Sequence, residues 1–375
     1  MKSPRQYEER FSRRSNLHVA GRRLLQAKTV FVMTRLFSSF ILPPLIWRVS
    51  ILDYLHTLTV PTPFPVGPIN CYLAQGDELT LVDTGPNHPA TLPALRDALS
   101  ACGRGFKDIR RIIVTHAHVD HFGLAARIVA ASGARVCSHA RNRWWLTDFE
   151  NETRQRAGFY YDVFAQSGAP RPFADAAARG MAAVMRCAEP IPAECFIPLE
   201  EGDLVTLGDA GWRVVYAPGH ASGLICLYEP QARALISSDH LLRDITSNPV
   251  LEPPARGESE RPRALVNYLA SLQKIAQLDV RLALPAHGEP IYDVGALIEA
   301  RLAFHRARLD HMERQLAGCG STAYELCHTL FPNLKSVDVF LGLSEVIGHL
   351  DLLESAGRVR RAMSEGVVRY TPTSK

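Results

Sequence analysis

The most informative stretch of the chain is THAHVDHFG, residues 115–123, which holds three histidines and an aspartate within six residues. The apolar run 112–114 precedes it and is typical of a buried strand. Residues 124–131 follow it and have the pattern of a helix. The motif is therefore predicted to lie on a strand-to-helix loop, where functional side chains are commonly held by a rigid scaffold.

Side chains alternate along an extended segment, so His116, His118 and Asp120 are expected to point to one side, with His121 at the start of the helix. Neutral imidazole and carboxylate oxygen are ligands that suit zinc, and also iron or manganese. The alternative is a polar surface loop in which Asp120 caps the helix. The density of ligand-type residues favours a metal site.

Composition indicates a globular protein with a substantial core: 375 residues, 47% hydrophobic and 21% charged. Residues 1–47 hold nine Lys/Arg and two Glu, a charge of +7, so the rest of this +4 chain carries −3. That balance gives no electrostatic argument for nucleic acid. The eight cysteines are scattered without a Cys-x-x-Cys pair, which argues against a disulfide framework and predicts a cytoplasmic protein.

Residues 1–47 are predicted to be a basic, disordered leader. Its apolar part, residues 36–47, is too short to span a bilayer, and Pro43 and Pro44 would break a helix. No small-residue cleavage site follows, so we expect neither a secretory signal nor stable membrane insertion.

Residues 48–292 alternate short strands with helices. A hairpin is predicted at 69–74 and 79–82, helices at 89–100 and 263–278, and strands at 204–207, 212–216, 224–228 and 234–237. Residues 140–195 interrupt this rhythm as a helical insertion rich in aromatics. The insertion is predicted either to form a lid or substrate wall or simply to pack its aromatic side chains.

Three further ligand-type residues follow predicted strands: His220 in Pro218-Gly219-His220, Asp239, and His287 in Pro285-Ala286-His287. A lone histidine is more often structural, so each is weak evidence alone. His240, next to Asp239, is interpreted as a packed or solvent-exposed histidine.

The motif Thr-His-x-His-x-Asp-His resembles the signature of the metallo-β-lactamase superfamily, including its glyoxalase II-like members. The later Pro-Gly-His, Asp and Pro-x-His-Gly pieces appear in that family's order, over residues 51–290. The resemblance implies an α/β fold, a four-layered αββα sandwich. It also implies two divalent metal ions, of which zinc is the expected metal and iron and manganese are the alternatives. Carried over residue by residue, the implied ligands are His116, His118 and His220 for one ion, Asp120, His121 and His287 for the other, and Asp239 between the two.

The resemblance also covers Asn70-Cys71-Tyr72-Leu73 and Asp83-Thr84-Gly85, and it implies that Asp83 holds a ligand or the motif loop in position. His118 stands where the family's diiron flavoproteins have Glu. The full second site with His121 and His287 favours a two-metal hydrolase. In such enzymes a metal-bridged hydroxide attacks an ester-type bond, and Asp120 is a candidate catalytic proton acceptor. Expected substrates are small molecules: a thioester of the hydroxyacylglutathione type, an ester or a lactone. A phosphodiesterase or endoribonuclease, and a non-catalytic metal-binding protein, are the alternatives.

Residues 293–375 are predicted to form a winged helix, from helices at 293–317, 323–330 and 342–355 and a hairpin around 357–370. The superfamily branch of β-lactamase-like protein 2 has such a domain. His305, Arg308 and His311 are expected on a solvated helix face. Residues 342–357 contain no Lys or Arg, so a packing, dimerisation or substrate-wall role is favoured over DNA reading. Weak nucleic-acid contact remains open because of four arginines in the predicted wing, Arg358, Arg360, Arg361 and Arg369.

Overall fold

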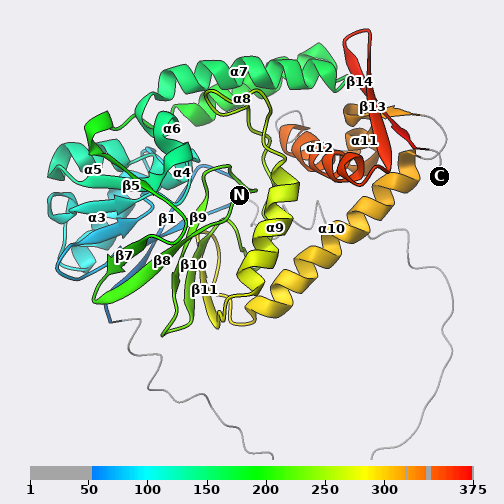
Figure 1. Ribbon diagram of the computed structural model, residues 1–375. Coiled ribbons are helices and arrows are strands. Elements are labelled where there is room, and N and C mark those ends of the chain that lie inside the picture. Colours follow the sequence, from blue (N-terminus) through cyan, green and yellow to red (C-terminus); the bar gives the residue numbers. More distant parts are fainter. Residues whose placement is uncertain (1–52, 317–319, 335–338, 374–375) are drawn as a thin grey trace, which may run out of the picture.

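The computed structural model describes residues 53–316, 320–334 and 339–373 (Figure 1). The predicted leader, residues 1–47, lies outside this part of the chain. The described chain contains two central sheets, helices on their outer faces, and a C-terminal group of helices with a small third sheet.

The first central sheet has six strands in sequence order. Its first three strands pair antiparallel, with Ala74 opposite Thr80 across the predicted hairpin, and the last four pair parallel. The strands are β1 (Leu55–Val60), β2 (Ile69–Ala74), β3 (Thr80–Val82), β4 (Arg111–Ile113), β5 (Arg135–His139) and β6 (Phe196–Leu199).

The second central sheet has five strands in the order β11-β10-β9-β8-β7. Only β10 and β11 pair parallel. The strands are β7 (Leu204–Leu207), β8 (Ala210–Tyr216), β9 (Ile225–Glu229), β10 (Ala234–Ser238) and β11 (Leu282–Pro285).

Neighbouring residues on one strand face different cores, as the alternation of side chains requires. Ile113 and Ile236 belong to the core between the two sheets, around the fully buried Trp212. Ile112 belongs to the core beneath the helices of the first sheet, and Leu235 to the core beneath those of the second.

Both sheets are therefore covered on their outer faces. Helices α3 (Thr91–Ala101), α4 (Val119–Phe122) and α5 (Ala125–Ser132) contribute to the core outside the first sheet. Helices α9 (Ala264–Ala276) and α10 (Val294–Leu316) contribute to the core outside the second sheet. The predicted αββα sandwich is confirmed.

The predicted insertion at 140–195 is helical. Its elements are η2 (Ala140–Asn142), α6 (Arg143–Thr147), α7 (Phe149–Gln166), α8 (Arg171–Met185) and η3 (Ala193–Cys195). In Figure 1 α7 and α8 lie side by side along the top of the molecule and reach from the sheets to the C-terminal helices.

The C-terminal elements follow the order α10, β12 (Ser321–Thr322), α11 (Ala323–Leu330), α12 (Val339–Ser355), β13 (Val359–Ser364) and β14 (Val367–Pro372). The three strands form a sheet in the order β12-β14-β13. Thr322 and Glu325 make a reciprocal capping box that fixes the start of α11. The predicted helices and hairpin are present; their assignment as a winged helix, and the boundary at residue 293, stay predictions.

The solvated face predicted for α10 is wrong for two of its three residues. His305 is 1% exposed and Arg308 is 8% exposed, whereas His311 is exposed. The reason is α12, which packs against α10 and brings Glu345 and His349 onto this face. Among the described residues, no helix is long and apolar enough to cross a membrane.

Candidate metal centre

All seven predicted ligand residues lie at the same edge of the sandwich. His116, His118, Asp120 and His121 occupy the segment from the end of β4 through α4. The others come from the β8–β9 loop, the end of β10 and the end of β11: His220, Asp239 and His287. Backbone hydrogen bonds from Ile225 to Thr115 and from Asn70 to Ala286 join the two sheets at this edge. Loops far apart in sequence therefore meet there.

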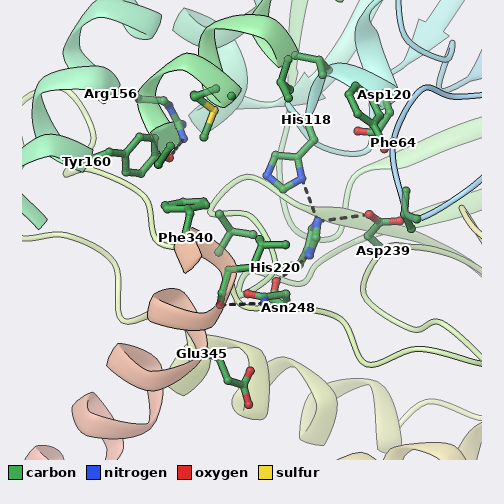
Figure 2. A pocket seen from close by; sticks show the side chains of 18 of the residues that line it. Phe64, His118, Asp120, Arg156, Tyr160, His220, Asp239, Asn248, Phe340 and Glu345 are labelled. Atoms are coloured by element: carbon green, nitrogen blue, oxygen red, sulfur yellow. Dashed lines mark hydrogen bonds and ion pairs between the residues drawn. The ribbon is translucent and has the colours of Figure 1, made fainter. Parts of the chain in front are cut away.

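One group contains three histidines. The Nδ1 atom of His118 lies 3.0 Å from Nε2 of His116 and 2.9 Å from Nε2 of His220. One ligand atom of each residue lies within 4.8 Å of the other two. Figure 2 shows His118, His220 and Asp239 pointing toward one another.

The second group contains Asp120, His121 and His287. The Nε2 atom of His287 lies 3.5 Å from Asp120 Oδ2, and that of His121 lies 4.0 Å from Asp120 Oδ1. Asp239 contacts both groups: its Oδ2 is 3.3 Å from His220 Nε2 and 3.5 Å from His121 Nε2, and its Oδ1 is 3.6 Å from His287 Nε2.

Three of the histidines have their other ring nitrogen engaged. The Nδ1 atom faces Asp83 Oδ2 at 2.8 Å in His121, the Asn248 carbonyl at 2.9 Å in His220, and the Pro68 carbonyl at 2.7 Å in His287. These oxygens accept, so each Nδ1 carries a hydrogen and each Nε2 is the nitrogen left to face the centre. A metal ligand needs this orientation of the ring.

Several inward-facing atoms are buried without a hydrogen-bonding partner: His121 Nε2, His287 Nε2 and Asp239 Oδ1. Leaving such a group unsatisfied costs about 1–3 kcal/mol. A divalent cation among these atoms would satisfy all three at once, so the residues present fit a metal ion.

Asp83 holds the motif loop in place. Its Oδ1 accepts from the Thr115 backbone N–H at 2.9 Å, and its Oδ2 accepts from Thr115 Oγ1 at 2.8 Å. Asp83 and Ser238 both have left-handed backbone conformations, with φ of 58° and 49°. Non-glycine residues with such strained backbone conformations are common at functional sites, where the surrounding structure stabilises the conformation.

Two glycines are required by close approach of other segments. A Cβ atom on Gly123 would lie 2.4 Å from the Cys187 carbonyl oxygen, and one on Gly219 would lie 2.4 Å from Tyr268 Cα. Gly219 also has φ of 143°. These contacts explain the glycine that ends the first motif and the glycine before His220.

The charges in the centre are unbalanced. Burial, with His220 close by, lowers the pKa of His118 to about 3. Burial alone would raise the pKa of Asp120, but His121 and His287 lower it to about 2. Burial likewise opposes the positive form of His121, yet Asp83 and the two other carboxylates raise its pKa well above the usual value. The carboxylates of Asp83, Asp120 and Asp239 therefore favour a positive charge in the centre, which either a proton or a metal cation can supply.

A cavity of about 600 Å³, called the chamber below, adjoins the centre. Four predicted ligands line it: His118, Asp120, His220 and Asp239. The chamber extends to residues of α7, α8, α10 and α12, and Figure 2 shows Tyr160 and Phe340 on its far side from Asp120. Tyr160 and Phe164 of the insertion pack in a core and also line the chamber; the role of the insertion as a lid or substrate wall stays a prediction.

A buried ion pair beside the centre had no counterpart among the sequence predictions. Arg156 lies 3.3 Å from Glu252, which also accepts the Ser222 backbone N–H at 2.7 Å. Arg156 stacks over Trp145, with its guanidinium carbon 4.2 Å from the ring centroid. The pair joins α7 to the loop that carries His220.

A further cluster of ligand-type side chains, His305, Glu345 and His349, lies between α10 and α12. Arg308 is 3.7 Å from Glu345 and already supplies a positive charge there. A cation would have to compete with that guanidinium, so we interpret this cluster as a buried ion-pair network. His240 is fully buried against Tyr268, in agreement with a packed histidine.

This fold and this arrangement of side chains define a class of protein. The sequence model described as the metallo-beta-lactamase superfamily matches residues 64–287. The chain belongs to the metallo-β-lactamase superfamily.

Two relatives of the chain are named as a probable metallo-hydrolase and a thioesterase. It is 34% identical to the probable metallo-hydrolase YqjP of Bacillus subtilis, over 85% of this chain and 97% of the relative. It is 30% identical to the acyl-coenzyme A thioesterase MBLAC2 of Gallus gallus, over 45% of this chain and 56% of the relative. Its structure resembles a metallo-beta-lactamase family protein from Thermus thermophilus, with a TM-score of 0.71 and 30% identity over 86% of this chain and all of that one.

Proposed function

We propose that the protein is a hydrolase that holds two divalent metal ions, zinc first, and cleaves an ester-type bond, with thioesters as the favoured class. One ion is assigned to His116, His118 and His220, the other to Asp120, His121 and His287, with Asp239 shared. Iron and manganese are the alternatives for the metal because the same ligands suit them.

The observation that carries the proposal is the set of buried atoms without a hydrogen-bonding partner on His121, His287 and Asp239. Asp239 lies 3.5 Å from His121 Nε2 and 3.6 Å from His287 Nε2. A protein that lacked a cation here would leave these groups unsatisfied at considerable cost. The engaged Nδ1 atoms of His121, His220 and His287 support the same interpretation, because they fix each ring with Nε2 inward.

When bound, divalent ions supply acidified water and polarise a carbonyl oxygen, which is the chemistry that ester hydrolysis requires. The chain's own contribution is orientation and proton handling. Asp120, ionised because His121 and His287 lower its pKa to about 2, lies 3.5 Å from His287 Nε2 and is the proposed proton acceptor. Asp83 fixes His121 and the loop that carries Asp120.

Thioesters are favoured over phosphodiesters for two reasons. One relative is named as an acyl-coenzyme A thioesterase. In addition, α12, the helix expected to read nucleic acid in a winged helix, is buried over most of its length. Three of the wing arginines already pair with carboxylates: Arg358 with Glu313, Arg361 with Glu354, and Arg369 with Glu325.

The test is a substrate panel on the metal-loaded full chain: an acyl-coenzyme A thioester, a p-nitrophenyl ester, a lactone, bis-p-nitrophenyl phosphate and single-stranded RNA. We expect the highest kcat/KM on the thioester, and its loss in Asp120→Asn. Turnover of the phosphodiesters alone would overturn the substrate class, and no turnover of any substrate would favour the non-catalytic alternative.

A further inference from the structure

We propose that the chamber binds a long, unbranched apolar acyl chain, and that α7, α8 and the C-terminal helices together form its walls. This inference rests on the proposed function, because it assigns the part of the substrate that lies next to the bond being cleaved. It names a substrate class, long-chain acyl thioesters, and gives the C-terminal elements a role in selecting it.

The chamber and the metal centre are continuous. His118, Asp120, His220 and Asp239 line the chamber at one end and are predicted metal ligands. A carbonyl group held at these residues would therefore have the rest of its acyl group directed into the chamber or out toward solvent. The volume of about 600 Å³ is in the range that accommodates a small-molecule ligand.

The walls are predominantly apolar. From α7 they include Tyr160 and Phe164, and from α8 they include Ala177, Met181 and Met185. Beside Tyr160, Phe340 and Leu341 of α12 complete the wall. The rings of Tyr160 and Phe340 meet with centroids 4.7 Å apart, so the insertion and the C-terminal helices close on each other.

The three arginines that line the chamber already have partners. Arg156 pairs with Glu252, and Arg308 lies 3.7 Å from Glu345. Arg301 donates to the backbone carbonyls of Leu242 and Ile245. These arginines would contribute little to binding a polar or anionic leaving group, because their charges already have partners. An apolar chain would be stabilised in the chamber because it leaves water. We therefore place the acyl chain, and not the leaving group, in the chamber.

The Arg308–Glu345 pair limits the chain length. In Figure 2 Glu345 lies at the other end of the view from His118 and Asp120, with His220 and Asn248 between them. Both side chains of the pair are nearly buried, at 7% and 9% exposed. A chain long enough to reach them would press a methyl group against an ion pair, so the preference is expected to rise with length and then fall.

The first experiment measures kcat/KM of the metal-loaded full chain on saturated acyl-coenzyme A thioesters from two to eighteen carbons. A fully buried methylene contributes about 0.8 kcal/mol, which is about fourfold in kcat/KM. We expect a rise of two- to fourfold per methylene up to an optimum, followed by a decline. A flat profile, or one that favours acetyl, would overturn the inference and leave the proposed function standing.

The second experiment needs no catalysis. Metal-loaded protein is titrated with cis-parinaric acid, whose fluorescence rises in an apolar site, and with butanoic acid as competitor. We expect saturable binding of the long chain that butanoic acid does not displace. Binding in a protein that hydrolyses no ester would refute the proposed function but keep the chamber assignment, whereas absence of saturable binding would refute the assignment.

A pair of variants on one helix localises the site. Ala177→Phe fills the chamber, whereas Ala183→Phe places the same ring on the exposed face of α8. We expect Ala177→Phe to weaken parinaric acid binding at least tenfold and to shift the optimum to shorter chains, with Ala183→Phe within twofold of wild type. Equal effects of the two variants would place the acyl site elsewhere. Should Ala177→Phe fail to fold, Met181→Trp, which also enlarges a chamber-lining residue of α8, is expected to give the same shift.

Discussion

At the scale of the residue, the centre depends on groups that orient its ligands without belonging to them. Asp83 accepts three hydrogen bonds, from the Thr115 backbone and hydroxyl and from His121. The carbonyls of Asn248 and Pro68 do the same for His220 and His287. Asp83 could be predicted because it belongs to a short sequence motif. The two carbonyls could not, because a backbone acceptor does not depend on the side chain that the sequence shows.

Asp83→Asn keeps a residue type that tolerates the left-handed conformation but weakens the acceptor. We expect it to lower metal affinity about 10–100-fold, the usual cost of removing a partner that orients a ligand. Competition with a chromophoric chelator measures this. Asp77→Asn, on the exposed tip of the β2–β3 hairpin, is the control. Unchanged affinity in Asp83→Asn would show that the loop holds its shape without the carboxylate.

His305 predicts a pH dependence of stability. Burial lowers its pKa to about 4, and His349 and Arg308 oppose its charging while Glu345 favours it. The unfolded chain, with an ordinary pKa near 6.5, binds more protons between these values, so the free energy of unfolding falls as pH falls. From pH 7 to pH 5 this residue should remove about 2 kcal/mol.

The measurement is urea unfolding of metal-free protein at both pH values. From pH 7 to pH 5 the free energy of unfolding should fall by about 2 kcal/mol more in the wild type than in His305→Gln. The surface variant His328→Gln should show the same fall as the wild type. Equal losses in all three proteins would show that His305 is not buried in its neutral form.

At the scale of the element, α7 is tied to the loop that carries His220. The link is the Arg156–Glu252 pair, 96 residues apart in sequence, together with the hydrogen bond from Ser222 to Glu252. Both side chains are largely buried, at 17% and 7% exposed. Breaking one partner of a buried pair leaves a charge without compensation.

A double-mutant cycle tests this link. We expect Arg156→Met and Glu252→Gln each to lower the free energy of unfolding by about 3 kcal/mol, and the double variant to lose clearly less than their sum. The exposed pair Arg127–Glu189, at 47% and 51% exposed, is the control and should couple by less than about 1 kcal/mol. Coupling of the same size in both cycles would contradict a role for burial.

At the scale of the whole molecule, the sandwich and the seven clustered residues followed from local patterns. A strand before each His or Asp places it at a strand end, and the resemblance supplied the order. The burial of His305 and Arg308 did not follow, because α10 is polar and the helix that covers it lies some forty residues later. The chamber could not be predicted either, since its walls come from α7, α8, α10 and α12, which only tertiary packing brings together.

The central claim is that distant loops join to hold two cations. The most direct measurement is the metal content per chain, by plasma mass spectrometry after dialysis against buffer containing zinc and then without it. We predict two ions in the wild type, about one in the Asp120→Ala/His121→Ala double variant, and two in the surface control Asp77→Asn. One ion or none in the wild type, or two in the double variant, would contradict the account.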